Sequence, residues 1–334
     1  MSVRISIVTP SYQQAAFLED CLLSVAGQEH AEVEHIVVDG GSTDGSVAIL
    51  ERNADRLAWW CSEKDAGQSD AINKGLARAT GEVFGWLNSD DALLPGALQR
   101  VAQAFDRDPQ LLVYGGQRVL RDDQGAERIA PLDDPSDPGR LHIAPMVNQQ
   151  STFFRLAAVR ELGGVDPVLH YAMDHELWLR LLFRFGTEHL RFEAEPLAIF
   201  RVHGAMKSRA MDRAFTGEIA GILYGLCLNA GLADLAGILR IGHRWPEGMR
   251  SIPADKEHGA LVLRMTRYFL LKWHHVIHRK DQFRMMRALS EMDLLHDTSL
   301  DGEERAWLAT LRSQLRVPGW WAFRLRRKWR HLTR

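Results

Sequence analysis

Short apolar runs alternate with amphipathic segments of helical length along the first third of the chain. Four of these runs predict strands by their β-branched and aromatic content: ISIVTPS, EHIVVDG, LAWWCSE and EVFGWLN. Strands that alternate with such helices form βαβ units, whose strands lie parallel in one sheet. We therefore expect an α/β fold with a mostly parallel sheet flanked by helices on both faces.

The pattern changes further along the chain. Residues 114–125 predict a hairpin, and residues 156–162 and 174–186 predict helices that end at glycines. Beyond about residue 210 the strand signals fade, and the remaining segments read as helices. We expect a large α/β domain over residues 1–208 and a helical, basic region over residues 209–334.

The net charge of −2 hides an asymmetry between these two parts. Residues 1–204 carry 18 Lys and Arg against 30 Asp and Glu, whereas residues 205–334 carry 23 against 13. Clustered carboxylates in the first part are consistent with a divalent-cation site. The basic second part suits phosphates, an anionic membrane surface or a partner protein.

Composition disfavours several other classes of protein. The three cysteines show no CxxC spacing, which indicates a reducing compartment and no zinc or disulfide framework. The N-terminus, MSVRISIVTPSY, lacks the long apolar centre of a signal peptide. No window approaches 18 uninterrupted apolar residues, so a spanning helix is not expected. These features predict a cytoplasmic protein.

Polar residues follow the predicted strands where each strand ends. In an open α/β sheet the carboxyl ends of parallel strands line one crevice, and ligands bind there. The strand-end residues are Thr9, Pro10 and Ser11, then Asp39, then Glu63 and Asp65, and finally Asn88, Asp90 and Asp91. Their convergence predicts a binding crevice more strongly than any single motif does.

Two stretches carry acids next to glycines. DGGSTDGS, residues 39–46, lacks the spacing of a P-loop or of a dinucleotide fingerprint. Asp39 can accept a hydrogen bond from a bound base or ribose; a capped turn without a ligand is the alternative. SEKDAGQSDAINKG, residues 62–75, contains Asp65 and Asp70, and Asp70 also suits the first turn of a helix.

The stretch WLNSDD, residues 86–91, ends a strand on two adjacent acids. Adjacent carboxylates repel one another unless a cation, a helix cap or water separates their charges. Mg²⁺ and Mn²⁺ prefer oxygen ligands, and one or two carboxylates commonly share such an ion with substrate phosphates. The stretch therefore predicts a metal-bound diphosphate; a helix cap by Asp90 or Asp91 is the alternative.

Five segments in this order resemble a family 2 glycosyltransferase of the GT-A fold: ISIVTPSY, VVDGGSTDGS, SEKDAGQSDAINKG, ATGEVFGWLNSDD and AMDHELWLRL. The resemblance covers residues 3–205. It implies a Rossmann-like GT-A sheet, a nucleotide-sugar donor and a Mn²⁺ or Mg²⁺ cofactor. The implied donor site comprises Thr9, Pro10, Ser11, Tyr12, Asp39, Asp65, Asp70, Asn88, Ser89 and Asp90.

The resemblance also implies the metal ligands. The family's DXD motif falls on Asn88-Ser89-Asp90, so Asp90 is the implied ligand and Asn88 departs from the motif. Asn88 can still accept from ribose or from a metal-bound water. FRVHG resembles the RxH segment that closes the domain, which makes His203 a further metal or diphosphate ligand; a structural histidine is the alternative.

Asp174 matches the family's catalytic base, and Met173 replaces the Glu that usually precedes it. Such a base deprotonates the acceptor hydroxyl, which attacks the anomeric carbon opposite the departing nucleotide and inverts its configuration. A plain first-turn helix acid is the alternative. On the acceptor side we expect Asp91, Gln150 and Glu176.

Residues 316–334, RVPGWWAFRLRRKWRHLTR, interleave aromatic and basic residues without an acid. This composition suits an interfacial helix on an anionic bilayer. A helix that packs its tryptophans on the domain, or a homo-oligomer contact, is the alternative. No nucleic-acid-binding module accompanies these charges, so nucleic acid is not an expected partner.

The resemblance thus implies an inverting glycosyltransferase that moves a sugar, with UDP the expected nucleotide, to a glycan or lipid-linked acceptor in surface polysaccharide biosynthesis. Two alternatives belong to other classes of protein. A sugar-nucleotide pyrophosphorylase should show a Gly-rich N-terminal loop with Arg and Lys, and TPSYQQ supplies neither. A non-catalytic nucleotide-sugar-binding scaffold is the remaining alternative, favoured by Asn88 and Met173.

Overall fold

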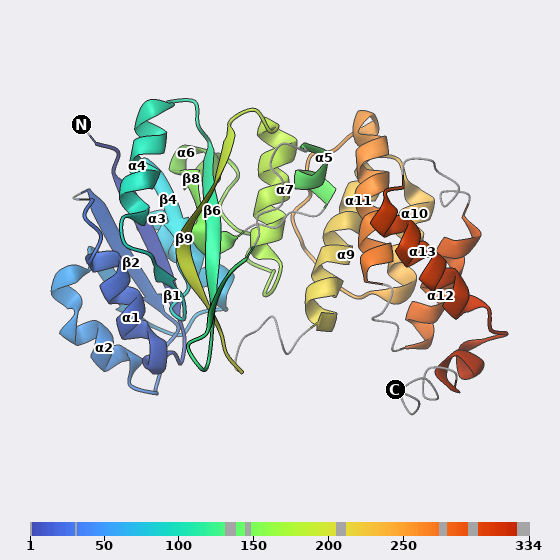
Figure 1. Cartoon of the computed structure of the whole chain (residues 1–334), viewed down its shortest axis with the longest axis horizontal. Coiled ribbons are helices and arrows are strands. Elements are labelled where there is room, and N and C mark those ends of the chain that lie inside the picture. The colour runs from blue at the N-terminus through green and yellow to red at the C-terminus, as the bar shows by residue number, and fades with distance from the viewer. Residues whose placement is uncertain are drawn as a thin grey trace. The chain divides into compact units, whose positions relative to one another are not determined.

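The computed structural model describes residues 2–30, 32–130, 138–143, 148–204, 212–273, 279–292 and 300–325. The chain divides into two compact units, and Figure 1 shows the sheet of the first and the helices of the second. Unit 1 comprises residues 1–141, 145–215 and 247–250, and unit 2 comprises residues 142–144, 216–246 and 251–334. The predicted boundary at residue 208 lies outside the described residues.

Nine described strands form the sheet of unit 1, in the order β3-β2-β1-β4-β8-β6-β9-β5 with β7 beside β6. The first four strands are β1 (Ile5–Ser11), β2 (Val33–Asp39), β3 (Trp59–Ser62) and β4 (Val83–Trp86). Strand β1 lies parallel to β2 and β4, and β2 lies parallel to β3. The carboxyl ends of these strands therefore meet at one edge of the sheet, as predicted.

Helices cover both faces of this parallel part (Figure 1). The connecting helices are α1 (Ala15–Ala26), α2 (Ser46–Arg52), η1 (Ala54–Arg56), α3 (Gln68–Arg78) and α4 (Ala97–Arg107). Successive residues of a strand point to opposite faces. Ile7 accordingly packs in a cluster with α1 and α4, whereas Val8 contacts Gly75 of α3. The α/β class is confirmed.

The sheet continues beyond β4 with mixed strand directions. The added strands are β5 (Ala92–Leu93), β6 (Val113–Asp122), β7 (Glu127–Ala130), β8 (Thr152–Arg155) and β9 (Leu190–Val202). Strand β8 is antiparallel to β4 and to β6, and β6 is parallel to β9. The predicted hairpin is β6–β7. Strand β9 was not predicted, because the acids and the proline in LRFEAEPLAIFRV interrupt its apolar pattern.

Unit 1 also contains helices before and after β8. Its remaining elements include most of α5 (Pro138–Ile143), η2 (Gln149–Ser151), α6 (Leu156–Glu161) and α7 (Met173–Phe185). Gly163 and Gly164 end α6 with φ angles of 79° and 76°, a left-handed conformation that favours glycine. Helix α7 buries Leu177 and Leu181 fully, and Gly186 ends it.

Unit 2 is helical in its described part. Its elements are most of α9 (Asp212–Asn229), α10 (Ala233–Gly242), η3 (Lys256–His258), α11 (Gly259–Lys272), α12 (Lys280–Glu291) and α13 (Gly302–Leu315). Leucines from these helices form its core: Leu226, Leu239, Leu271, Leu289 and Leu311 are fully buried. Among the described helices, none combines the length and apolar character needed to cross a bilayer.

The C-terminal aromatic residues divide into packed and exposed ones. Trp320 and Phe323 pack against Phe283, with ring centroids 6.1 and 5.3 Å from it. Trp321 is 69% exposed, and the guanidinium of Arg324 lies 5.8 Å from its ring. The basic residues after Leu325 lie outside the described residues. Packing therefore accounts for two of the aromatic residues and not for Trp321.

Candidate active site

Asp39 ends β2 and organises the turn that follows it. Its carboxylate accepts from the backbone N–H groups of Gly41 and Ser42 at 3.1 and 2.8 Å. The hydroxyls of Ser42 and Ser62 donate to it at 2.6 and 2.7 Å. Asp39 is fully buried, so this structure gives it the role of shaping the β2–α2 turn from within.

Asp65 lies against the same turn. A Cβ atom on Gly40 would come within 2.9 Å of Asp65 Oδ2, so the missing side chain lets this carboxylate approach. Asp65 Oδ1 accepts from Gly67 N at 2.9 Å. Asp70 accepts from Ala66 N at 3.1 Å and lies 3.5 Å from Lys74 Nζ, on the first turn of α3. The structure thus brings Asp39 and Asp65 together and leaves Asp70 at the helix start.

The end of β1 faces two environments. Thr9 is buried, and its hydroxyl lies 2.9 Å from His35 Nε2, where burial lowers the pKa of His35 to about 3. Pro10 and Ser11 are also buried. Tyr12 is 61% exposed and precedes Gln13, which has a φ angle of 54°. Of the four predicted residues, Tyr12 offers the accessible surface.

Asn88 is held on both sides of its amide. Gln68 Nε2 donates to Asn88 Oδ1 at 2.8 Å, and Asn88 Nδ2 donates to Gln149 Oε1 at 3.2 Å. Gln149 donates in turn to the carbonyl oxygen of Trp86. An aspartate at position 88 would lack the donor that Gln149 receives. The amide in place of the first acid of the DXD motif is therefore part of a hydrogen-bonded chain, and Ser89 is buried beside it.

Asp90 and His203 approach each other from β4 and β9. The distance from His203 Nε2 to Asp90 Oδ2 is 3.1 Å, and the His203 ring lies 4.7 Å from that of Phe17. Arg201 donates to the carbonyl oxygen of Asp90 at 3.1 Å and pairs with Asp20 at 3.0 Å. A carboxylate and an imidazole that already touch fit a divalent ion whose other ligands are water and phosphate. Within the described residues, no group of three potential ligands is assembled.

Asp91 is buried, and only one of its two carboxylate oxygens has a hydrogen-bond partner among the described residues. Oδ1 accepts from Arg201 N at 3.2 Å, whereas Oδ2 has no hydrogen-bond partner among the described residues. Burial and the neighbouring Asp90 charge raise the pKa of Asp91 well above its usual range. A buried carboxylate oxygen without a partner is costly unless a ligand or water reaches it.

Arg118 on β6 links Asp91 electrostatically to the predicted base. Burial lowers the pKa of the Arg118 guanidinium, whereas the charges of Asp91 and Asp174 oppose that shift. The guanidinium lies 4.9 Å from the Phe200 ring, and its Nε atom has no hydrogen-bond partner within the described part of the chain. The charges of Asp91 and Asp174 therefore both act on this guanidinium, although the two acids are far apart in sequence.

Further buried polar atoms without a partner lie on the same strand ends. The described residues contain seven such side-chain atoms, and six belong to unit 1. Those six are Ser11 Oγ, Trp86 Nε1, Asp91 Oδ2, Arg118 Nε, Gln150 Nε2 and Ser151 Oγ. They lie on β1, β4, β6 and η2 and in the turn after β4. Native structures rarely leave such atoms unsatisfied, so each is a candidate for contact with a polar ligand or water. Gln150, predicted on the acceptor side, is one of them.

Glu176 requires a correction. It was predicted to face an acceptor, but it is fully buried, and both of its carboxylate oxygens bond to Arg180 four residues later on α7. Burial raises the pKa of Glu176, and Arg180 opposes the shift. A first-turn acid pointing into the packed side of an amphipathic helix cannot also reach substrate. Met173 is likewise a core residue, 4% exposed.

Sequence reasoning missed Gln68, Gln149 and Arg118. Each lies next to a motif that was identified, but its importance depends on contacts with residues distant in sequence. Gln68 and Gln149 are recognisable only once α3 and η2 are known to flank Asn88. Arg118 lies in the mixed stretch GGQRVLRD of β6, without a regular apolar pattern, and reads as an ordinary solvent-facing strand position.

Comparisons with known proteins agree with this geometry. The model of the family described as glycosyl transferase family 2 matches residues 6–163. An uncharacterized glycosyltransferase of Mycobacterium tuberculosis is 30% identical over 217 residues, which cover 59% of this chain and 80% of that protein. The O-antigen biosynthesis protein RfbC of Myxococcus xanthus is 34% identical over 259 residues, or 75% of this chain and 20% of that protein.

Two solved structures share the fold at low sequence identity. Staphylococcus aureus TarS 1–349 in complex with UDP-GlcNAc has a TM-score of 0.60 at 15% identity, covering 93% of this chain and 86% of that chain. The Pyrobaculum calidifontis mannosyltransferase PcManGT in complex with GDP-Man and Mn²⁺ has a TM-score of 0.54 at 16% identity, covering 93% and 85%. The predicted GT-A fold is confirmed, and the chain belongs to glycosyl transferase family 2.

Proposed function

We propose that this glycosyltransferase moves a sugar from a nucleotide-diphosphate donor to a hydroxyl of a glycan or lipid-linked acceptor, with inversion at the anomeric carbon. UDP is the proposed nucleotide, supported by the fold shared with the UDP-GlcNAc complex of TarS. A role in surface polysaccharide biosynthesis is supported by the name of the Myxococcus relative. The proposed location is the cytoplasm or the inner face of the membrane.

One observation carries this proposal: the turn after β4, which holds Asp90 and Asp91, lies beside His203, which follows β9. Asp90 touches His203 across 3.1 Å at the end of β4. Asp91 follows Asp90 directly in sequence, and the charges of Asp91 and Asp174 both raise the pKa of the Arg118 guanidinium. These observations support Asp90 and His203 as the proposed diphosphate-binding pair and Asp174 as the proposed base.

The donor is held by the turns at the carboxyl edge. Asp90 and His203 would hold a divalent cation, Mn²⁺ or Mg²⁺, which when bound supplies positive charge to the departing diphosphate. Asp65, resting on the glycine turn that Asp39 shapes, would meet the nucleotide together with the exposed Tyr12. The amide of Asn88 would present its remaining acceptor capacity to ribose or to a bound water.

The transfer step is a direct displacement at the anomeric carbon. As the acceptor oxygen bonds to that carbon, the bond from the carbon to the diphosphate oxygen breaks, and the nucleoside diphosphate leaves on the opposite face. Asp174 accepts the hydroxyl proton, a contribution typically worth about 10²- to 10⁴-fold. Asp91 Oδ2 and Gln150 Nε2, both without partners among the described residues, would bind hydroxyl groups of the acceptor.

The test is release of UDP from a panel of UDP-sugars with Mn²⁺, for the wild type and for Asp90→Ala and Asp174→Asn. We expect Asp90→Ala to lose Mn²⁺-dependent UDP binding, and Asp174→Asn to bind UDP normally but turn over about 10²-fold or more slowly. Asp123→Asn, on the exposed β6–β7 turn, is the control. A wild type without turnover of any nucleotide sugar contradicts the proposal and favours the non-catalytic scaffold.

A further inference from the structure

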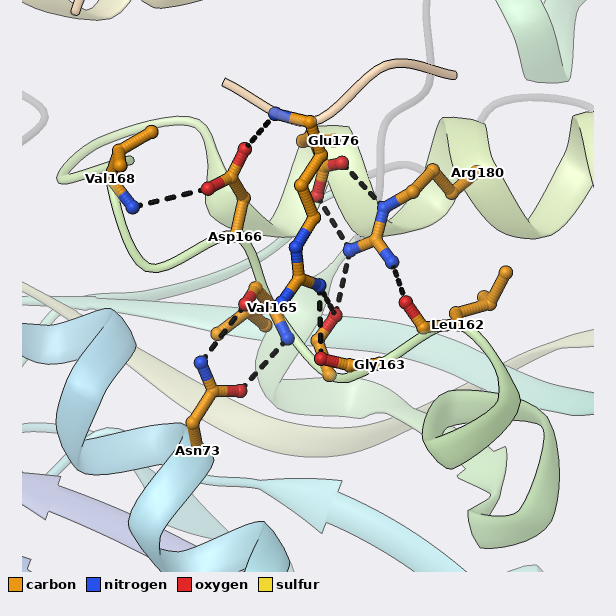
Figure 2. Close-up of polar contacts among 10 residues, drawn as sticks. Asn73, Leu162, Gly163, Val165, Asp166, Val168, Glu176 and Arg180 are labelled. Carbon is orange, nitrogen blue, oxygen red and sulfur yellow. Dashed lines mark hydrogen bonds and ion pairs between the residues drawn. The ribbon is translucent and has the colours of Figure 1, made fainter. Parts of the chain in front are cut away.

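Three side chains from separate parts of unit 1 hold the segment 162–169, which joins α6 to the base-bearing helix α7 (Figure 2). They are Asn73 on α3, Arg180 on α7 and Arg250, which lies between α10 and η3 in sequence. We call these three residues, with Glu176 and Asp166, the loop clamp. None of them was assigned this role from the sequence.

Arg180 holds the start of the segment. Its guanidinium donates to the carbonyl oxygen of Leu162 and, at 2.7 Å, to that of Gly164. The remaining N–H groups bond to Glu176, with Nη2 2.8 Å from Oε2. Arg180 is 4% exposed and Glu176 is fully buried. These carbonyl groups end α6, where the helix dipole favours a cation.

Arg250 holds the same segment from the other side. Its guanidinium donates to the carbonyl oxygens of Gly163 and Gly164 at 2.9 and 3.1 Å. Its backbone N–H donates to Asp166 Oδ2 at 2.7 Å, and Asp166 Oδ1 accepts from Val168 N at 3.1 Å. Asp166 is 1% exposed. Two guanidiniums therefore share one run of carbonyls, and a buried acid ties Arg250 to the segment.

Asn73 connects the segment to the donor side. Its amide donates to Val165 O at 2.9 Å and accepts from Val165 N at 3.0 Å. One turn earlier on α3, Ser69 Oγ donates to Leu169 O at 2.5 Å. Helix α3 begins at Gln68, directly after the turn that carries Asp65. The segment is therefore fixed on one side to the proposed nucleotide turn and on the other to α7.

The stability of the fold alone does not require this arrangement of buried charges. Burying an ion pair costs several kcal/mol per ion before the partner and the hydrogen bonds offset it, and apolar residues of similar volume often serve stability equally well. What a bidentate guanidinium adds is a single geometry for the groups that it bonds. Here those groups are the backbone leading to Asp174.

We propose that the loop clamp is a positioning device, which sets Asp174 relative to the donor turn through Arg180, Arg250 and Asn73. The inference rests on the proposed function, because it assigns a purpose to the placement of the proposed base. The clamp residues touch no substrate; they act through segment 162–169. Misplacing a reacting group by about 1 Å can cost on the order of 10²-fold in rate.

The experiment compares full-length wild type with Arg250→Met, Arg250→Lys and Arg184→Met. Arg184 is the matched control, because it also joins α7 to α6, through a pair with Glu161 at 2.7 Å in which both side chains are about half exposed. For each protein, kcat for UDP release from UDP-sugars with Mn²⁺ and Kd for UDP are measured. Hydrogen exchange of residues 163–175 is recorded on the same proteins.

We expect Arg250→Met to lower kcat about 10- to 100-fold with UDP affinity unchanged, and to speed exchange in residues 163–175. Arg250→Lys should recover only part of the rate, because an ammonium group keeps the charge but lacks the fixed geometry of a guanidinium, and Arg184→Met should match wild type. If the wild type is active and Arg250→Met has the same kcat, the inference about the loop clamp is overturned, while the proposed function stands. A parallel loss of UDP affinity would also overturn the inference.

An inactive wild type is a different outcome, since it refutes the proposed function and, with it, a device for placing the base. If Arg250→Met does not fold, Asn73→Ser decides. That variant removes only the amide contacts with Val165 and should show the same loss of kcat without loss of UDP affinity. Wild-type kcat in Asn73→Ser would then overturn the inference.

Discussion

At the scale of single residues, Asn88 shows how a departure from a motif becomes part of the structure. Its amide both accepts from Gln68 and donates to Gln149, which a carboxylate cannot do at neutral pH. The substitution removes one negative charge from the proposed metal site. Two protein ligands, Asp90 and His203, then remain for an ion that substrate phosphates must complete.

We expect Asn88→Asp to lower stability and to tighten Mn²⁺ binding. The lost donor leaves Gln149 facing a carboxylate, which should cost about 1 kcal/mol. The added charge beside Asp90 should strengthen Mn²⁺ binding about ten-fold, since ligand charge tunes such sites. Thermal unfolding and a Mn²⁺ titration in the presence of UDP measure the two effects.

Gln124→Glu makes the same amide-to-acid change on the exposed β6–β7 turn and is the control for Asn88→Asp. It should leave both measurements unchanged. Asn88→Asp could instead unfold at the same temperature as the wild type and bind Mn²⁺ with the same affinity. In that case the hydrogen bonds of Asn88 with Gln68 and Gln149 do not explain why position 88 is an amide.

At the scale of elements, the turns between strands and helices decide which acids meet. Asp39 shapes the β2–α2 turn from inside, and Gly40 leaves the space that Asp65 occupies from the β3–α3 turn. Two turns that are separate in sequence thus form one surface. Its shape depends on the absence of a single methyl group.

Gly40→Ala should therefore separate the two turns. The added Cβ would lie 2.9 Å from Asp65 Oδ2, closer than such atoms approach, so Asp65 must move. We expect UDP affinity to fall about ten-fold, or about 1.4 kcal/mol, with a smaller effect on the unfolding temperature. Isothermal titration with UDP and Mn²⁺ measures the change.

Gly237→Ala is the matched control for this glycine change. An added Cβ there meets no atom within 4 Å, and the position lies inside α10, where alanine favours the helix. It should bind UDP as wild type does. An unchanged UDP affinity in Gly40→Ala would show that Asp65 does not take part in nucleotide binding.

At the scale of the whole molecule, charge separates the chain into an acidic part with the proposed site and a basic helical part. Trp321 and Leu325 are 69% and 62% exposed, and Arg316 and Arg324 lie nearby in sequence. An exposed tryptophan among arginines suits the headgroup region of an anionic bilayer. We therefore keep peripheral membrane contact as a prediction, with a homo-oligomer contact as the alternative.

We expect the full-length protein to co-sediment with vesicles containing phosphatidylserine and not with phosphatidylcholine alone. Binding should weaken steeply as salt is raised, because each basic residue near the surface contributes about 1 kcal/mol. Trp321→Ser should reduce binding several-fold, and Tyr12→Ser, an exposed aromatic of unit 1, is the control. Concentration-dependent dimers without vesicle binding would support the homo-oligomer instead.

Much of the fold followed from local pattern, and less of the site did. Strands β1 to β4, helices α1 to α4, the β6–β7 hairpin and α7 were predicted, because apolar periodicity and glycine stops are properties of short segments. The two-residue strand β5 was not predicted. Strand β9 was not, since its pairing with β6 overrides a weak local signal. Glu176 was predicted on the acceptor side but is buried. Hydrophobic periodicity identifies buried helix positions only where the residues are apolar, so it gave no sign that this acid is buried.

What the sequence determined by itself is the family, the parallel direction of the first four strands and the acids at their ends. Those are local: a strand followed by a polar turn places its polar residues at the carboxyl edge wherever the sheet forms. Only the tertiary structure decided the partners, such as His203 for Asp90, Gln68 and Gln149 for Asn88, and Arg250 for Gly163. Such contacts join residues that lie 20 to 113 positions apart, and no pattern of neighbours specifies them.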